Sequence, residues 1–161
     1  ESVATNGVCL TVTAIRDKEY DCFAMPETLN ISAFGAGIPK KVNLERSLNA
    51  KDRFGGHFVQ GHVDGVGEVV KVEPGEDYRL SVAFPPENAP LVMYKGSITI
   101  NGASLTVAEA SDDTLTVALI PHTLEHTTLQ YLKEGDKVNL EFDMIGKYMA
   151  NILEKQAHAK S

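Results

Sequence analysis

The chain has 161 residues, of which 43% are hydrophobic, and it carries a formal net charge of −7 at pH 7. This length allows one or two small domains with an apolar core. Lys and Arg are scattered, which argues against a nucleic-acid partner, and no apolar run approaches the roughly 20 residues of a membrane span. We therefore expect no nucleic acid and no membrane among its partners.

The chain contains two cysteines, Cys9 and Cys22. So few cysteines fit free thiols in a reducing cytoplasm, although one disulfide between them is compatible with the sequence. We therefore expect a cytoplasmic protein. No Cys-x-x-Cys pair or calcium-binding loop indicates a metal site.

The first half of the chain reads as short strands separated by turns. Asn6-Gly7 favours a tight hairpin turn, because both residue types tolerate positive φ. Pro26 can begin a short helical segment, since its missing N–H is no loss there, and Gly35 ends it. Period-two alternation predicts strands over residues 8–15, 20–25 and 41–45.

Residues 55–62 form the seam between the two halves, with the sequence Gly-Gly-His-Phe-Val-Gln-Gly-His. His57 and His62 lie five residues apart. On a strand they would point to opposite faces, so they are a poor pair of metal ligands.

The second half repeats the pattern with three additional strands at its start. Strands are expected over residues 67–72, 78–84, 97–100, 104–108, 114–120 and 137–142. A short helix is expected over residues 90–94, and a short helix or turn over residues 121–131. Six short strands and a short helix predict a small closed β-barrel with Greek-key connections.

The tail predicts an amphipathic helix with Asp143 as its N-cap. Its apolar stripe has helical spacing and consists of Ile145, Tyr148, Met149, Ile152 and Leu153. The stripe either packs on the barrels or meets other chains.

One seven-residue phrase occurs twice. Asn-Gly-Val-Cys-Leu-Thr-Val begins at Asn6, and Asn-Gly-Ala-Ser-Leu-Thr-Val begins at Asn101, a spacing of 95 residues. Pro-x-Thr-Leu recurs from Pro26 to Pro121 at the same spacing, and Val-Asn-Leu-Glu recurs from Val42 to Val138. Collinear matches at one spacing indicate an internal duplication.

The duplication predicts an all-β protein of two similar six-stranded Greek-key barrels, followed by a C-terminal α-helix. We expect the first barrel over residues 1–56, the second over 57–143, and an oligomerisation helix and tail over 144–161. By comparison with the second copy, the first is expected to lack an opening portion of roughly 35–40 residues.

The two phrases differ at one chemically informative position, which is Cys9 in the first and Ser104 in the second. Both are small groups that can act as nucleophiles or hydrogen-bond partners. Either can instead simply fill a strand position.

Together these motifs resemble the riboflavin synthase family of the alpha type. The resemblance covers essentially the whole chain. It rests on the two Asn-Gly phrases, Gly55-Gly-His-x-x-x-Gly-His62, Tyr94-Lys-Gly, Ile120-Pro-x-Thr-Leu-Glu-x-Thr-Thr-Leu and Val138-Asn-Leu-Glu-x-Asp143.

The resemblance implies a dismutase of 6,7-dimethyl-8-ribityllumazine. One lumazine donates a four-carbon unit to another, giving riboflavin and 5-amino-6-ribitylaminopyrimidinedione without metal or redox cofactor. It also implies a homotrimer joined by the C-terminal helix. Each active site would then lie between the first barrel of one subunit and the second barrel of its neighbour.

The resemblance also implies the site residues. The catalytic candidates are Ser2, Cys9, His62, Ser104, Thr106 and Asp143. The substrate-binding candidates include Cys9, His62, Ser104 and Thr106, together with Leu10, Thr11, Ala24, Met25, Pro26, Glu27, Thr28, Gly61, Val63, Lys95, Asn101, Leu105, Ile120, Pro121, His122 and Thr123. His62 could move a proton, and Cys9, Ser2 or Ser104 could add to the lumazine ring or hold the water that does.

Several candidates also have ordinary structural interpretations. Ser2 can be a frayed end, Lys95 a surface lysine, Asp143 a helix cap and His62 a hydrogen-bonded seam residue.

Two departures from the family pattern matter. Position 101 is Asn where some members carry Asp, so a charged role there is not expected, and the opening Met-Phe-Thr-Gly segment is absent, so the first pocket is expected to be incomplete.

Two further functional classes remain alternatives at this stage. The first is a non-catalytic lumazine or flavin carrier of the same fold. The second is a bare β-barrel interaction module that binds no such ligand. Formation of riboflavin from the lumazine separates the enzyme from both.

Overall fold

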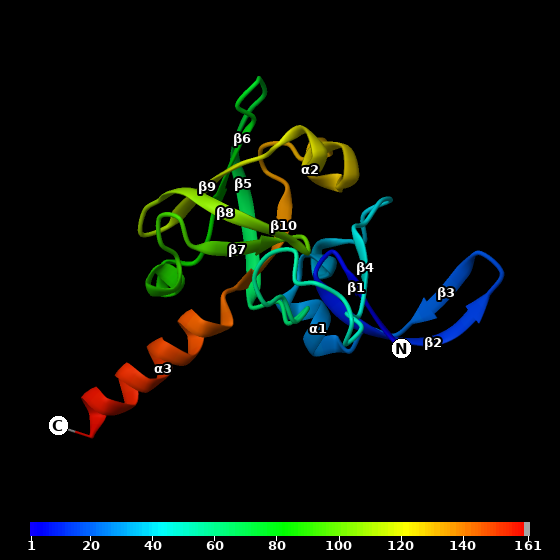
Figure 1. The fold of residues 1–161 in the computed structure, drawn as a ribbon, viewed down its shortest axis with the longest axis horizontal. Helices are drawn as coiled ribbons and strands as arrows, with labels where there is room; N and C mark the ends of the chain where they lie inside the picture. Colours follow the sequence, from blue (N-terminus) through cyan, green and yellow to red (C-terminus); the bar gives the residue numbers. More distant parts are fainter. Residues whose placement is uncertain (160–161) are drawn as a thin grey trace.

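The computed structural model describes residues 1–159, and in it the chain forms two β-units and a projecting C-terminal helix (Figure 1). The last two residues of the predicted tail, 160–161, lie outside this range. No helix in residues 1–159 is long and apolar enough to cross a membrane.

The second unit is a closed six-stranded barrel, as the sequence predicts. Its antiparallel strands are β5 (Gly65–Glu73), β6 (Arg79–Ala83), β7 (Ser97–Ile100), β8 (Ala103–Ala110), β9 (Thr114–Ala118) and β10 (Lys137–Phe142). They close in the order β10-β5-β6-β9-β8-β7, so the chain skips neighbours between β6 and β7 and between β9 and β10. Alternate residues fill the interior, including the fully buried Leu80, Ile98, Leu115 and Phe142.

The first unit is a four-stranded sheet within the described residues. It contains β1 (Ser2–Thr5), β2 (Val8–Arg16), β3 (Glu19–Cys22) and β4 (Leu44–Arg46), in the order β3-β2-β1-β4. Its small core comprises Val8, Leu10, Phe34 and Val63.

The strand registers confirm the predicted duplication. Ala4 pairs with Cys9 between β1 and β2, and Thr99 pairs with Ser104 at the equivalent place between β7 and β8. A register shift interrupts β2–β3 between Val12 and Ala14, and β8–β9 shows the same shift between Val107 and Glu109. Cys9 and Ser104 therefore occupy equivalent strand positions.

Short helical segments connect the strands. They are α1 (Pro26–Ile31), η1 (Ala33–Ala36), η2 (Pro86–Leu91), α2 (Pro121–His126) and η3 (Thr128–Tyr131). The helix predicted over residues 90–94 instead begins at Pro86, where a proline at the first helical position needs no N–H partner. The strand predicted over residues 20–25 ends at Cys22, before the segment that leads into α1.

The two Asn-Gly turns lie back to back between the units. Their residues adopt the positive φ that hairpin turns require: Asn6 44° and Gly7 79°, Asn101 47° and Gly102 84°. A Cβ built on Gly7 would lie 2.8 Å from the amide N of Gly102, and the reverse contact has the same length. Glycine is therefore needed at both positions.

Four buried or half-buried asparagines join these turns reciprocally. The side-chain amide of Asn43 donates to the carbonyl of Asn101 at 2.8 Å, and that of Asn139 donates to the carbonyl of Asn6 at 2.8 Å. In turn, Oδ1 of Asn6 accepts from the Asn43 N–H at 2.7 Å, and Oδ1 of Asn101 accepts from the Asn139 N–H at 2.8 Å. Each hydrogen bond in one repeat has its counterpart in the other.

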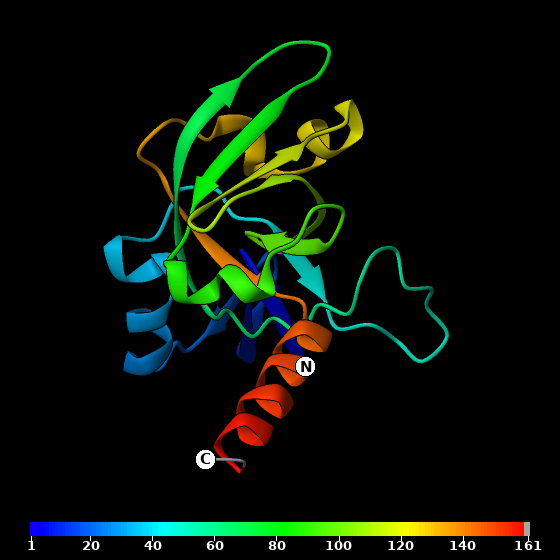
Figure 2. The same ribbon diagram turned by 90° about the vertical axis from the view of Figure 1, so that its left-hand side faces the viewer.

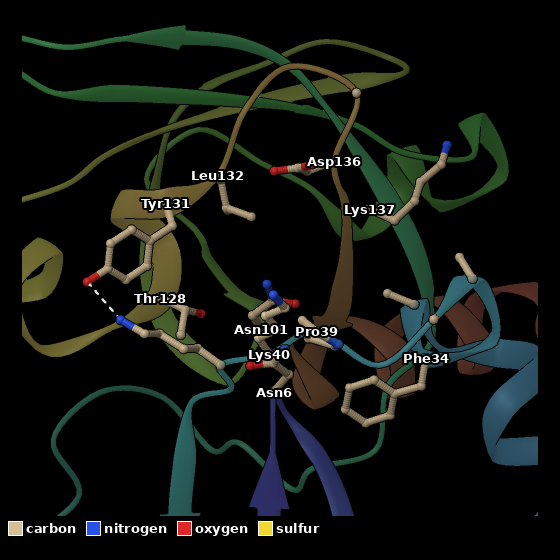
Figure 3. Close-up of a pocket in the computed structure, with 15 residues that line it drawn as sticks. Asn6, Phe34, Pro39, Lys40, Asn101, Thr128, Tyr131, Leu132, Asp136 and Lys137 are labelled. Atoms are coloured by element: carbon tan, nitrogen blue, oxygen red, sulfur yellow. Dashed lines mark hydrogen bonds between the residues drawn. The ribbon is translucent and has the colours of Figure 1, made fainter.

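The asparagines also anchor the helical segments. Oδ1 of Asn139 accepts from the Ala33 N–H at 2.7 Å, and Oδ1 of Asn43 accepts from the Thr128 N–H at 2.7 Å. Beside the turns lies a cavity of about 550 Å³ between residues 33–41 and 128–137, which Figure 3 shows with Asn6 and Asn101 at its centre. This cavity is therefore bordered by equivalent segments of the two repeats.

The C-terminal helix α3 (Met144–His158) begins as the sequence predicts, because Oδ1 of Asp143 accepts the Ile145 N–H at 2.9 Å. It projects away from the barrel (Figures 1 and 2). Its predicted apolar stripe, Ile145 to Leu153, is 49–65% exposed. The stripe therefore does not pack on the barrel of its own chain.

We predict that Asn139→Ala lowers the free energy of unfolding by about 2–4 kcal/mol, because it leaves the buried Asn6 carbonyl and the Ala33 N–H without their partner. Asn151→Ala, on the exposed polar side of α3, is the matched control and should change it by about 0.5 kcal/mol or less. Urea unfolding measures both. Equal effects of the two substitutions would contradict the inter-repeat role of Asn139.

Candidate active site

A cavity of about 810 Å³ lies where the two repeats and the seam meet. Cys9 and Ser104, the differing residues of the repeated phrase, both line it. The seam contributes Gly55, Gly56, His57, Val59, Gln60 and Gly61. The structure thus brings the equivalent residues of the two repeats to one cavity.

Cys9 faces out of its sheet because its neighbours Val8 and Leu10 face the core. Its backbone N–H donates to the carbonyl of Gly61 at 2.8 Å. A Cβ on Gly61 would lie 2.8 Å from Cys9 Cβ, so the seam packs directly against the thiol-bearing residue. Cys9 and Cys22 are both free and exposed, so the disulfide left open by the sequence is absent from the structure.

Ser104 is exposed on β8 in the same way, and its hydroxyl contacts His57. His57 Nδ1 lies 2.7 Å from Ser104 Oγ, and the His57 backbone N–H donates to the same oxygen at 3.4 Å. His57 Nε2 lies 3.2 Å from Thr99 Oγ1. His57 was not among the site residues predicted from the sequence, although the repeated Gly-His pair at 56–57 and 61–62 marks it.

The environment of His57 favours a neutral ring. Its burial lowers the pKa of His57 below the usual 6.5, and the carboxylates of Asp143 and Glu141 oppose that shift. The same Glu141 holds the seam: its buried carboxylate accepts the Gln60 N–H at 2.7 Å and the Gly61 N–H at 3.0 Å. Glu141 therefore fixes the backbone between the two Gly-His pairs.

Other predicted catalytic residues lie on the same strand faces. Ser2 pairs with Thr11 across β1 and β2, and Ser97 pairs with Thr106 across β7 and β8. Thr11 and Thr106 are exposed, two residues beyond Cys9 and Ser104. His62 is exposed directly after Gly61.

Several predicted binding residues have structural contacts of their own. The side chains of Leu10, Val63 and Leu105 lie in the hydrophobic cores, and that of Asn101 belongs to the asparagine network. Asp143 caps α3. Lys95 has φ 61°, and its Nζ lies 5.6 Å from the centroid of the Tyr94 ring.

The predicted pocket segments 24–28 and 120–123 occupy equivalent positions at the starts of α1 and α2. They comprise Ala24, Met25, Pro26, Glu27 and Thr28 in the first repeat and Ile120, Pro121, His122 and Thr123 in the second. Neither segment lines the cavity that holds Cys9 and Ser104. Across residues 1–159, no cluster of three or more His, Cys, Asp or Glu side chains could hold a metal ion.

Comparison with known proteins defines the class of the chain. The sequence profile of the lumazine binding domain matches residues 1–47 and 60–143, which include both repeats. The chain is thus a protein of the lumazine-binding class.

Curated relatives make the assignment narrower. The chain is 43% identical to riboflavin synthase of Bacillus amyloliquefaciens, covering 100% of this chain and 76% of the relative. It is 42% identical to riboflavin synthases of Bacillus subtilis (strain 168), covering 100% and 76%, and of Actinobacillus pleuropneumoniae, covering 97% and 74%. The chain therefore belongs to the riboflavin synthase family.

Solved structures agree on the fold. The chain resembles LumP complexed with 6,7-dimethyl-8-(1'-D-ribityl) lumazine, with a TM-score of 0.77 and 26% identity over 88% of this chain and 76% of that one. LumP complexed with riboflavin gives a TM-score of 0.77 and 28% identity over 88% and 77%.

We predict that Gly61→Ala destabilises the protein by about 1–3 kcal/mol, because Gly61 has φ 76° and the added methyl meets Cys9. Gly55→Ala serves as the control, since Gly55 has nothing within 4 Å of its built Cβ and no positive φ. Denaturant unfolding of the two variants tests this. A Gly61→Ala protein as stable as the control would show that the seam does not press on Cys9.

Proposed function

We propose that this chain acts as a riboflavin synthase, converting two molecules of 6,7-dimethyl-8-ribityllumazine to riboflavin and 5-amino-6-ribitylaminopyrimidinedione. The observation that carries the proposal is that the two repeats place Cys9 and Ser104 at equivalent positions. A reaction between two identical substrates needs two similar binding surfaces, and the duplicated phrase places Cys9 and Ser104 at equivalent strand positions, one on each repeat. Identity of 42–43% to riboflavin synthases supports it.

The chemistry sets what the residues must do. One lumazine loses a proton from its acidic 7-methyl group, and a nucleophile activates the other. A four-carbon unit then passes between them, so atoms and electrons balance without an external oxidant. The protein must therefore move protons, supply a nucleophile and hold two rings together.

We assign these roles to the exposed residues of the two repeats. Cys9 or Ser104 adds to the ring or holds the attacking water, and His62 moves the proton. Ser2, Thr11 and Thr106 bind ring and ribityl groups from neighbouring strand positions. Lys95 and Asp143 steady developing charge and hydroxyls.

Two binding segments complete this assignment. Residues 24–28 and 120–123 line one lumazine pocket each through backbone groups. Their equivalent positions at the starts of α1 and α2 support the assignment. The free thiols of Cys9 and Cys22 support a cytoplasmic location.

A trimer is part of the proposal. The apolar stripe of α3 is exposed and needs a partner surface, because a helix of this size is marginal alone in water. We propose that α3 joins three chains and that each active site combines the first repeat of one chain with the second repeat of another.

The alternative is a non-catalytic carrier, which the resemblance to lumazine-bound LumP favours. Incubation of the protein with 6,7-dimethyl-8-ribityllumazine separates the two. The enzyme produces riboflavin absorbance as lumazine absorbance falls. Binding of lumazine without its consumption would establish the carrier instead.

We predict that Cys9→Ser keeps the fold and lowers turnover by about tenfold or more, because the thiolate is the stronger nucleophile. The second repeat already carries Ser at the equivalent position, so the side chain fits. Cys22→Ser is the control for loss of a thiol outside the cavity. Steady-state turnover that is unchanged in Cys9→Ser would reduce Cys9 to a packing residue.

We predict that truncation after Asp143 gives folded, inactive monomers, because the stripe of α3 is lost while the barrel core is untouched. Sedimentation and riboflavin formation are measured on the intact and truncated proteins. A truncated protein that remains trimeric, or a monomer with full activity, would contradict the proposed assembly.

A further inference from the structure

Two histidines of the short helix α2 lie in contact with each other. His122 is the second residue of α2 and His126 is the last. Their rings are stacked, with centroids 4.1 Å apart and planes inclined by 28°. Both residues are exposed. The proposed function uses only backbone groups of residues 120–123, so it leaves these two rings without a role.

The ring of His126 is oriented by the helix itself. Its Nδ1 lies 2.8 Å from the carbonyl oxygen of His122, and because a carbonyl only accepts, Nδ1 carries the proton and donates it. The lone pair of the neutral ring is then on Nε2. Histidines that bind metals almost always donate their other ring N–H to a carbonyl, carboxylate or water, which fixes the tautomer and the ring orientation. His126 is therefore held as a metal-binding histidine is held.

The spacing of the two histidines allows both rings to reach one ion. Residues four apart lie on the same face of a helix, whereas His57 and His62 of the seam are five apart. Zn²⁺ binds histidine nitrogens at about 2.0–2.1 Å, so two such nitrogens of a tetrahedral site lie about 3.3 Å apart. Rings that are already stacked reach this separation by small rotations of their side chains.

The fold does not require this pair of rings. The equivalent helix of the first repeat, α1, has the same length and also begins with a proline. It carries Glu27 and Ile31 at the positions of His122 and His126. A helix of this shape therefore forms without the stacked rings, and the histidine pair belongs to the second repeat alone.

The pair also adjoins the candidate active site. His126 and the next residue, Thr127, line the cavity that holds Cys9 and Ser104. Thr127 Oγ1 donates to the carbonyl of Thr123 at 2.7 Å, which ties the end of α2 to the segment that follows it. An ion bound to His126 would therefore lie beside the wall of this cavity.

We propose that His122 and His126 together bind a divalent transition-metal ion of the Zn²⁺ and Cu²⁺ class, and that an ion bound there obstructs the cavity. Imidazole nitrogen is a preferred ligand of these ions, and the exposed position leaves their other coordination positions to water. The ion takes no part in the four-carbon transfer. Its binding is independent of the proposed function, and only the obstruction rests on that function.

Calorimetric titration of the protein with zinc chloride tests the site, and one ion per chain is expected. His122→Gln and His126→Ile should each weaken the affinity for Zn²⁺ by about 10²-fold, because one ligand no longer holds the ion in place for the other. Isoleucine stands at the position of His126 in α1, so the helix should be kept. An affinity that is unchanged in either variant would overturn the proposal and leave the rings as a simple stacking contact.

Two further variants are the controls. His158 on α3 also has its Nδ1 2.8 Å from the carbonyl oxygen four residues earlier, but that residue is Glu154 and not a second histidine. His158→Gln should therefore leave the affinity for Zn²⁺ unaltered. Cys9→Ser removes the thiol in the cavity and should also leave it unaltered. Loss of Zn²⁺ binding in Cys9→Ser would place the ion on the thiol and overturn the proposal.

Riboflavin formation tests the obstruction. Saturating Zn²⁺ should lower the rate of the unaltered protein, and this loss should disappear in His126→Ile, when each rate is compared with that of the same protein without metal. Inhibition that persists in His126→Ile would overturn the obstruction. Calorimetry detects the site even in a protein that forms no riboflavin, so failure of the proposed function is distinguishable from failure of this inference.

Discussion

The structure depends on the contact between two Asn-Gly turns. Each turn places a glycine against the backbone of the other, and four asparagines tie each turn to the opposite repeat. Because the amides pair with backbone groups that are otherwise buried and unsatisfied, the register between the repeats is tightly specified. The strands that leave the two turns are β2 and β8, so the same contact brings Cys9 and Ser104 to one side of the molecule.

The seam, residues 55–62, borders the cavity that both repeats line. Glu141 accepts two backbone N–H groups of the seam and holds it between the repeats. Gly61 of the seam then packs against Cys9 and Gly56 against Ser104, and a histidine follows each of these glycines. The duplication supplies two similar surfaces, which the proposed function assigns to two identical substrates, and these surfaces differ in carrying Cys9 in the first repeat and Ser104 in the second.

Local sequence patterns were enough to predict much of this fold. Period-two alternation located β2 and β10, Asn-Gly located the turns, and Asp143 began α3. The predicted bounds of the first strand after the seam, 67–72, and of the next helix, 90–94, differ from the observed Gly65–Glu73 and Pro86–Leu91. The strand ends depend on pairing within the barrel, and two consecutive prolines determine where the helix begins. His57 was missed because its contact with Ser104 spans 47 residues and depends on how the seam crosses the barrel. The asparagines were visible as a repeated Val-Asn-Leu-Glu, but their bonds exist only once the turns abut.

The most direct test of the account is a crystal structure of the protein with riboflavin, the product that the proposed function assigns to it. The account predicts one ligand on each repeat, the first beside Cys9 and Gly61 and the second beside Ser104 and His57. Ligand found only in the other cavity, between residues 33–41 and 128–137, would contradict it, since neither Cys9 nor Ser104 lines that cavity.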